Sequence, residues 1–173
     1  MSARLPWIKR KWRFDFPVEL FPDILERLRG TAARLEEMLR GVAADVLTRR
    51  DKPGAWSIQE NVGHLREVEA IWLGRLEDYL ADAKTLRPAD MTNRATHDAN
   101  YNAMPIGTVL SSFRTERDRF VARLDALQDA DFARVAQHPR LETPMRLVDA
   151  CLFAADHDDY HLARIWELLN QGK

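Results

Sequence analysis

The feature of this sequence that most constrains its fold is a set of four long segments with apolar residues at helical spacing. In each segment the apolar residues recur every three or four positions, which places them on one face of a helix. The segments are residues 18–42, 58–81, 106–127 and 144–170. No strand-like alternation or internal repeat stands out. Since 173 residues suit one domain, the pattern predicts an all-α four-helix bundle over residues 1–173.

The starts of two predicted helices carry local signals. Ser57 is a good N-cap, and Glu60 three residues later completes a capping box for the second helix. Thr143 followed by Pro144 predicts an N-cap with proline in the first turn of the fourth helix.

Two connections and an N-terminal arm complete the predicted organisation. Residues 85–105 are polar and aperiodic, and a connection this long is unusual in a compact domain. It allows the third helix to start at the far end of the bundle, so that the second and third helices run parallel. Residues 128–142 form a second irregular stretch. Residues 1–17 are aromatic and basic, and they predict an extended arm that gives the bundle hydrophobic cover.

Composition and charge exclude several classes of protein. The 26 Lys and Arg against 27 Asp and Glu leave no broad basic surface of the kind that duplex nucleic acid requires. No stretch approaches ~18 uncharged apolar residues, so no membrane span is expected. Residues 1–21 lack the apolar run of a signal peptide. The single cysteine, Cys151, cannot form an intramolecular disulfide, and we expect it to be a buried core thiol in a cytoplasmic protein.

Three histidines carry the clearest indication of chemistry. His157 and His161 are four residues apart, so their Cβ atoms lie about 5–6 Å apart on one helix face and both imidazoles can reach one metal ion. Such a pair also occurs on solvated surfaces. His64 lies at the edge of the apolar stripe of the second helix, where it is a candidate third ligand or a structural hydrogen-bonding group. Three carboxylates near the pair can orient imidazoles as acceptors: Asp156, Asp158 and Asp159.

The sequence around these histidines resembles a known family. The matching stretches are residues 56–65 (WSIQENVGHL), 157–165 (HDDYHLARI) and 27–31 (RLRGT). One histidine on the second helix followed by a His-x-x-x-His pair on the fourth resembles the DinB/YfiT superfamily of metalloenzymes, over nearly the whole chain. The resemblance implies a four-helix bundle with a long crossover between helices 2 and 3. It also implies that the three histidines bind one divalent metal, zinc or nickel, with water at open positions.

The histidine pair differs from the zincin motif of metalloproteases. In H-E-x-x-H the second position is a glutamate that acts as general base. Here that position is Asp158, one methylene shorter, and the third candidate ligand precedes the pair. A metalloprotease is therefore not expected.

Three neutral imidazoles with an open position are typical of a catalytic metal site, which activates water or a thiolate. We expect an enzyme acting on a small molecule, with transfer of a low-molecular-weight thiol first and hydrolysis second. A non-catalytic metal-binding or stress-response protein is the alternative from another class. The family resemblance and the five tryptophans also suggest a homodimer. Candidate groups for a charged thiol are Asn93, Arg94, Asn102 and Arg164.

Four further polar residues are assigned by their place in the helical pattern. Glu69 falls within the apolar stripe of the second helix and Arg117 within that of the third. An unpaired buried charge is costly, so we expect the two to form an ion pair inside the bundle, although either side chain could reach solvent from the edge of its stripe. His97 and His138 fall in predicted loops, where solvent exposure is expected.

Overall fold

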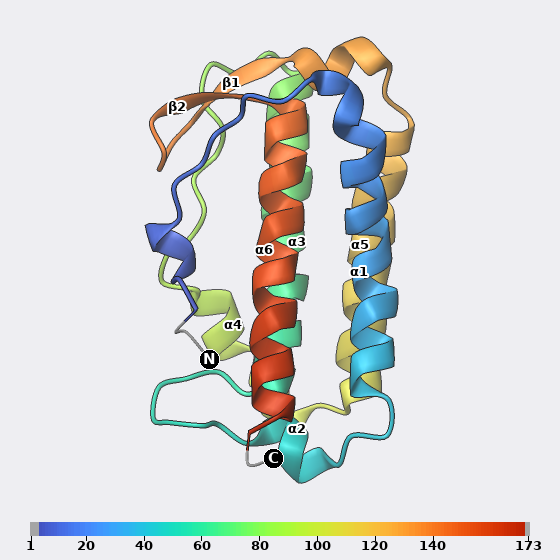
Figure 1. Cartoon of the computed structure of the whole chain (residues 1–173), viewed down its shortest axis with the longest axis vertical. Helices are drawn as coiled ribbons and strands as arrows, with labels where there is room; N and C mark the ends of the chain where they lie inside the picture. The colour runs from blue at the N-terminus through green and yellow to red at the C-terminus, as the bar shows by residue number, and fades with distance from the viewer. Residues whose placement is uncertain (1–3, 172–173) are drawn as a thin grey trace.

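The computed structural model describes residues 4–171, and its main body consists of four long helices. They are α1 (Phe21–Leu39), α3 (Ile58–Leu80), α5 (Ile106–Asp125) and α6 (Leu147–Leu169). In Figure 1, α1 and α6 run from top to bottom, whereas α3 and α5 run from bottom to top. The all-α four-helix bundle is confirmed, and each of these helices lies within a few residues of its predicted limits.

Short elements occupy the connections between the long helices. They are α2 (Ala44–Thr48), α4 (Arg94–Asp98), β1 (Val135–His138), β2 (Thr143–Arg146) and 3₁₀ turns at Trp7–Lys9, Val18–Leu20, Tyr101–Ala103 and Asp129–Ala133. The ends of the predicted domain, residues 1–3 in the arm and residues 172–173, lie outside the described residues.

The connection between α3 and α5 crosses the length of the bundle, so these two helices run parallel as predicted (Figure 1). Side chains at the start of α3 hold the second half of this connection in place. Gln59 Nε2 donates to the carbonyl oxygen of Met104 at 2.6 Å, and Ser57 Oγ donates to Asn102 Oδ1 at 2.7 Å. The predicted capping box between Ser57 and Glu60 is also present. The start of α3 therefore holds both its own first turn and the crossover.

The predicted start of the fourth helix at Pro144 is wrong. Thr143–Arg146 is strand β2, which pairs antiparallel with β1, and α6 begins only at Leu147. Pro144 fits this strand because it lies opposite Gln137, whose backbone N–H and carbonyl bond Lys84 and Leu86 instead. The position opposite Gln137 therefore needs no N–H donor, the group that proline lacks.

His138 does not lie in an exposed loop, as predicted, but is buried at the end of β1. Its position results from pairing between residues that lie on both sides of the hairpin turn. Strand β1 could not be recognised in the sequence because its four residues, Val-Ala-Gln-His, do not alternate between apolar and polar.

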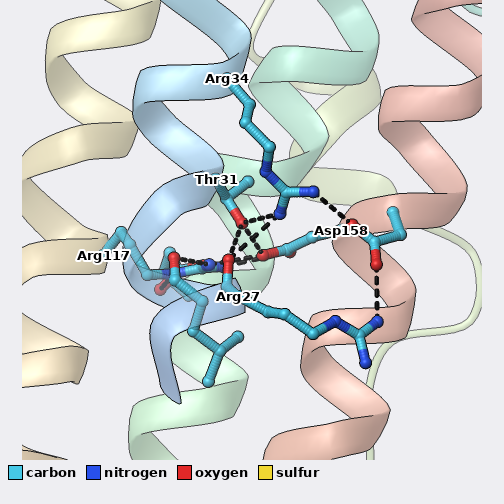
Figure 2. A network of polar contacts seen from close by, with 8 residues as sticks. Arg27, Thr31, Arg34, Arg117 and Asp158 are labelled. Atoms are coloured by element: carbon cyan, nitrogen blue, oxygen red, sulfur yellow. Dashed lines mark hydrogen bonds and ion pairs between the residues drawn. The ribbon is translucent and has the colours of Figure 1, made fainter. Parts of the chain in front are cut away.

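A buried polar network links all four long helices, and it contains the predicted pair of Glu69 and Arg117. Arg117 NH2 on α5 lies 2.6 Å from Glu69 Oε1 on α3, and both side chains are buried. The same guanidinium binds Asp158 on α6, with NH1 and Oδ2 2.5 Å apart. Thr31 on α1 donates its hydroxyl to Asp158 at 2.7 Å (Figure 2). The ion pair is confirmed, and the network holds the four helices in one mutual register.

Candidate metal centre

The structure brings the three predicted histidines together in the interior. His64 comes from the second turn of α3, whereas His157 and His161 lie one turn apart on α6. Their ring centroids are 4.6 to 5.3 Å apart. One ring nitrogen from each lies within 4.8 Å of the others, and all three residues are buried. The three ring nitrogens are therefore close enough together to bind a single metal ion.

Hydrogen bonds from outside the centre orient two of the rings. Asn61 Nδ2 donates to the carbonyl oxygen of Ser57 at 2.7 Å, which turns its Oδ1 toward His161 Nδ1, 2.9 Å away. That nitrogen must carry the proton, because Oδ1 can only accept, so the Nε2 lone pair of His161 is free for a metal. His64 Nδ1 lies 3.1 Å from Thr96 Oγ1 on α4. Asn61 and Thr96 therefore act as the orienting groups that metal-binding histidines require.

Burial keeps the three imidazoles neutral. Removal from water lowers the pKa of His64 and of His157 to about 3, with added repulsion from His157 and Arg117, respectively. The pKa of His161 is also well below its ordinary value, because of burial first and then the neighbouring imidazoles. Neutral histidine is the form that binds a metal, so protons do not compete for these nitrogens near neutral pH.

Contacts between the rings also fit a shared ion. His64 Nε2 and His157 Nε2 lie 3.4 Å apart. Nitrogens that bind one zinc ion at ~2.0–2.1 Å in tetrahedral geometry are separated by about the same distance. In the part of the chain that the structure describes, His157 Nδ1 is buried without a hydrogen-bond partner, so no orienting group holds this ring from the Nδ1 side. The donor set therefore fits a divalent metal.

The three carboxylates near the pair do not contact the imidazoles, contrary to prediction. Asp156 and Asp159 each accept from Arg27 NH2 at 2.6 Å. Asp158 binds Arg117 and Thr31 instead (Figure 2). These carboxylates lie on the parts of α6 that face α1 and α5, whereas the histidines face α3. The carboxylates therefore hold α6 in place and leave the orientation of the rings to Asn61 and Thr96.

A cavity of about 420 Å³ reaches the three histidines. Its walls come from six parts of the chain, namely the arm, the loop before α3, α3, the crossover, the hairpin and α6. Trp7 of the arm packs against His157, with ring centroids 5.1 Å apart, and against Phe153 at 4.9 Å. The arm therefore builds one wall of the site in addition to giving the predicted hydrophobic cover. A second, more open cavity of about 940 Å³ lies beside His161 and includes Arg4, Lys52 and Arg164.

Comparison with known proteins agrees with the fold. A family model described as the DinB superfamily matches residues 24–165, which include all three histidines. The chain belongs to the DinB superfamily.

Two proteins of Bacillus subtilis illustrate the relationship of this DinB-superfamily chain to others. The uncharacterized protein YuaE (strain 168) is 24% identical over 152 residues, which cover 79% of this chain and 92% of YuaE. The solved structure of YfiT has a TM-score of 0.77, with 22% identity, and the match covers 92% of this chain and 91% of YfiT. YfiT is described as a probable metal-dependent hydrolase with an unusual four-helix bundle topology. The structural likeness shows that the two chains share this fold.

Of the four residues predicted to bind a charged thiol, one lines the cavity that holds the three histidines in this superfamily member. Asn93 lines the 420 Å³ cavity. Arg164 lines the larger one but pairs with Asp51 at 2.7 Å. Arg94 is exposed and pairs with Asp98, and Asn102 accepts from Ser57. Only Asn93 is thus brought to the cavity that holds all three histidines.

Three further expectations can be compared with the structure. Cys151 is free and buried, and burial raises the pKa of its thiol to about 12, so it is the predicted core thiol. His97 is exposed on α4, as expected. No helix among residues 4–171 has the length and apolar character needed to cross a membrane.

Sequence reasoning missed several residues that shape the site. Asn61 lies three residues before His64 on the same helix, a spacing that puts the two side chains on neighbouring positions of one face. That spacing was the one available signal. Thr96 and Trp7 come from an irregular crossover and an arm, where periodicity carries no information on contacts.

Proposed function

We propose that this protein is a metal-dependent hydrolase of a small molecule, in which His64, His157 and His161 hold one divalent ion, zinc or nickel. The observation that carries the proposal is the convergence of three buried, neutral imidazoles at a cavity large enough for a small substrate. The description of YfiT as a probable metal-dependent hydrolase adds support, because that protein shares the fold.

The residues of the chain divide the work at such a site. A divalent ion bound by three neutral imidazoles keeps a position for water or substrate, polarises it and lowers the pKa of bound water. Asn61 and Thr96 keep the imidazoles pointed at the ion. Trp7, Trp56 and Trp72 line the cavity with apolar surface and restrict the entry of bulk water.

Transfer of a low-molecular-weight thiol is the second candidate. The larger cavity supports it, since Arg4, Lys52 and Arg164 offer positive charge to an anionic thiol beside His161. We rank hydrolysis first because both of these arginines already pair with carboxylates, Arg4 with Glu167 and Arg164 with Asp51. Metal binding without catalysis is less favoured, because a protein of that kind has no need for cavities that reach its metal.

Metal analysis of the purified protein followed by activity assays tests the proposal. We expect about one zinc or nickel ion per chain, and hydrolysis of some members of a panel of small carboxylic esters, amides and phosphoesters. His157→Ala should lose both the ion and the activity, whereas Thr115→Ala, which replaces an exposed side chain of α5 outside both cavities, should keep both. A wild-type protein that binds no divalent ion would overturn the proposal. Activity only with a thiol and an electrophile would favour the second candidate.

A further inference from the structure

Two arginines in the 420 Å³ cavity have no acidic partner. Arg75 on α3 and Arg140 in the hairpin turn both line this cavity. Among residues 4–171, no carboxylate lies within ion-pair distance of either guanidinium. The contrast with Arg117 is informative. Both Arg75 and Arg117 are buried, but Arg117 binds two carboxylates and Arg75 binds none. A buried cation without a direct counter-ion is costly, so an anion that binds beside Arg75 would be stabilised.

The hydrogen bonds of His138 show that the same spot lacks an acceptor. Its Nδ1 accepts from the backbone N–H of Leu141 at 3.1 Å. A neutral imidazole has one acceptor and one donor nitrogen, so Nε2 must carry the proton. Arg75 NH1, which can only donate, lies 3.1 Å from this Nε2. Two donors thus face each other in a buried place, and an oxygen that accepts from both would remove the conflict.

Other cavity residues make the surroundings of Arg75 rich in donors. The Nε1–H of Trp72 is buried without an acceptor among the described residues. Arg75 Nε already donates to the carbonyl oxygen of Arg87, which fixes the plane of its guanidinium. Asp90 is the acidic residue of this wall, and its oxygens already accept from Thr92 and from the backbone N–H of Arg94. The carboxylate of this wall is therefore already engaged, whereas Trp72 Nε1–H has no acceptor and Arg75 NH1 faces another donor.

We propose that Arg75, His138 and Arg140 form an anion subsite that binds a carboxylate or phosphate group at one end of the molecule whose other end reaches the three histidines. The second half of this statement, that the bound molecule is the substrate, rests on the proposed function. The subsite itself needs no metal. Arginine suits it because its planar fork binds two oxygens of such a group at once.

The spacing along α3 sets the shape of the molecule. Arg75 follows His64 by eleven residues on α3, and the ring of Trp72 lies 5.8 Å from the Arg75 guanidinium and 5.7 Å from the ring of His157. Between them the cavity wall is formed by Val68, Ile71 and Trp72 of α3 and by Phe153 of α6. An anionic group at Arg75 and a reactive group at the histidines are thus joined by an extended apolar chain or ring system. The chemical class is an amphipathic small molecule with one anionic end.

Binding of octanoate to metal-free protein, prepared with a chelator, tests the subsite by calorimetry. Octanoate and octyl phosphate should bind at least 10-fold more tightly than octanamide, which has the same chain without the charge. Arg75→Gln and Arg140→Gln should each weaken octanoate binding about 10-fold or more and leave octanamide unchanged. The second variant guards against misfolding, because Arg140 is only half-buried. Arg66→Gln is the matched control, since Arg66 lies on the same helix and pairs with Glu67.

The outcomes separate this proposal from the metal proposal. Equal affinity for octanoate and octanamide, no octanoate binding at millimolar concentration, or unchanged octanoate affinity in both arginine variants would overturn the subsite. Octanoate binding that persists in His157→Ala and depends on Arg75 would support the subsite, even if the wild-type protein were found to bind no metal. Loss of octanoate binding in Arg66→Gln as well would show that the effect is not specific and would count against it.

Discussion

At the residue scale, two short polar side chains decide how the histidines can be used. The hydroxyl of Thr96 lies at His64 Nδ1 and the amide of Asn61 at His161 Nδ1, so each ring is left with Nε2 toward the centre. Both partners are buried, and neither carries a charge. A neutral partner orients the ring without adding a carboxylate to the centre.

Replacement of one orienting group should therefore weaken metal binding. We expect Thr96→Val, which keeps the shape and removes the hydroxyl, to lower zinc affinity about 10–100-fold, as is usual for such partners. Thr115→Val is the control, because that exposed hydroxyl bonds only the carbonyl of Ser111 on its own helix. Competition with a fluorescent zinc chelator measures both. Equal affinities for the two variants would show that Thr96 has no orienting role.

His138 should make the stability of the fold depend on pH. Burial, together with Arg75 and Arg140, lowers its pKa to about 4. Above pH ~6.5 the ring is neutral in both the folded and the unfolded chain, so it has no effect. Between pH ~6.5 and 4 the unfolded chain binds a proton that the folded chain does not, so stability is lost as pH falls.

The variant His138→Gln should therefore show a shallower loss of unfolding free energy between pH 6.5 and 4. The difference in slope from wild type should be at most about 1.4 kcal/mol per pH unit. Urea titrations at several pH values measure it. Thr115→Val, at an exposed position with no titrating group, is the control and should follow the wild-type curve. Parallel curves for wild type and His138→Gln would contradict the assignment.

At the scale of the helices, the bundle is held in register by ion pairs, some of them buried and some exposed to solvent. Arg117 joins α5 to α3 and α6 through Glu69 and Asp158, with all three side chains removed from water. Arg123 and Glu77 join the same two helices, α5 and α3, on the surface, where each side chain is 47% exposed. The two pairs have the same chemistry and differ in burial.

Burial should decide what each pair contributes to stability. Glu69→Ala leaves Arg117 with less compensation in the interior, and we expect a loss of about 3–5 kcal/mol in unfolding free energy. Glu77→Ala breaks an exposed pair and should cost less than about 1 kcal/mol. Urea denaturation of the two variants gives the comparison directly. A Glu69→Ala protein as stable as wild type would sink the idea that this pair is an essential internal contact.

Two helical glycines offer a second comparison at this scale. A Cβ on Gly63 of α3 would lie 2.2 Å from Cδ2 of Tyr101, so the crossover needs glycine there for close approach. Gly30 of α1 has nothing within 4 Å of the same position. We expect Gly30→Ala to stabilise the protein by about 0.5–1 kcal/mol through helix propensity.

Gly63→Ala should destabilise the protein despite the same gain in propensity, because Tyr101 must move. Since Tyr101 and Thr96 lie on the same crossover, zinc affinity should fall as well. Thermal denaturation and zinc titration of the two variants test this pair of expectations. A stabilised Gly63→Ala protein with unchanged zinc affinity would contradict it.

At the scale of the whole molecule, the site is assembled from segments that are far apart in sequence. The arm, the crossover and the hairpin reach the same side of the bundle (Figure 1). Residues of all three line the 420 Å³ cavity together with residues of α3 and α6. Some apolar surface is left outside the cavity. Trp166 on α6 is 50% exposed, and such a residue is a candidate for contact with another protein surface.

We therefore keep the homodimer as a prediction. Light scattering should give twice the chain mass of 20.0 kDa at micromolar concentration. If Trp166 lies in the interface, Trp166→Glu should shift the protein to monomer, whereas Leu20→Glu, at another exposed apolar position, should not. A wild-type monomer at high micromolar concentration would rule out the dimer.

Features that depend on local spacing could be predicted from the sequence alone. Helical periodicity located four helices, and the Ser57–Glu60 spacing located the start of α3. The positions of Glu69 and Arg117 within two apolar stripes were enough to predict their contact, because a buried charge must find a partner. The i, i+4 spacing of His157 and His161 placed both on one face, and the family resemblance added His64.

The tertiary structure alone decided which distant segments meet. Pro144 reads locally as a helix start, yet it lies in a strand because Gln137 turns its hydrogen-bonding groups toward Lys84 and Leu86. Asp158 looked like a partner of the histidines, but the rotation of α6 turns it to Arg117. The meeting of Arg75, His138 and Arg140 likewise needs the hairpin folded against α3. Periodicity describes one element at a time, whereas these contacts arise from how the elements pack.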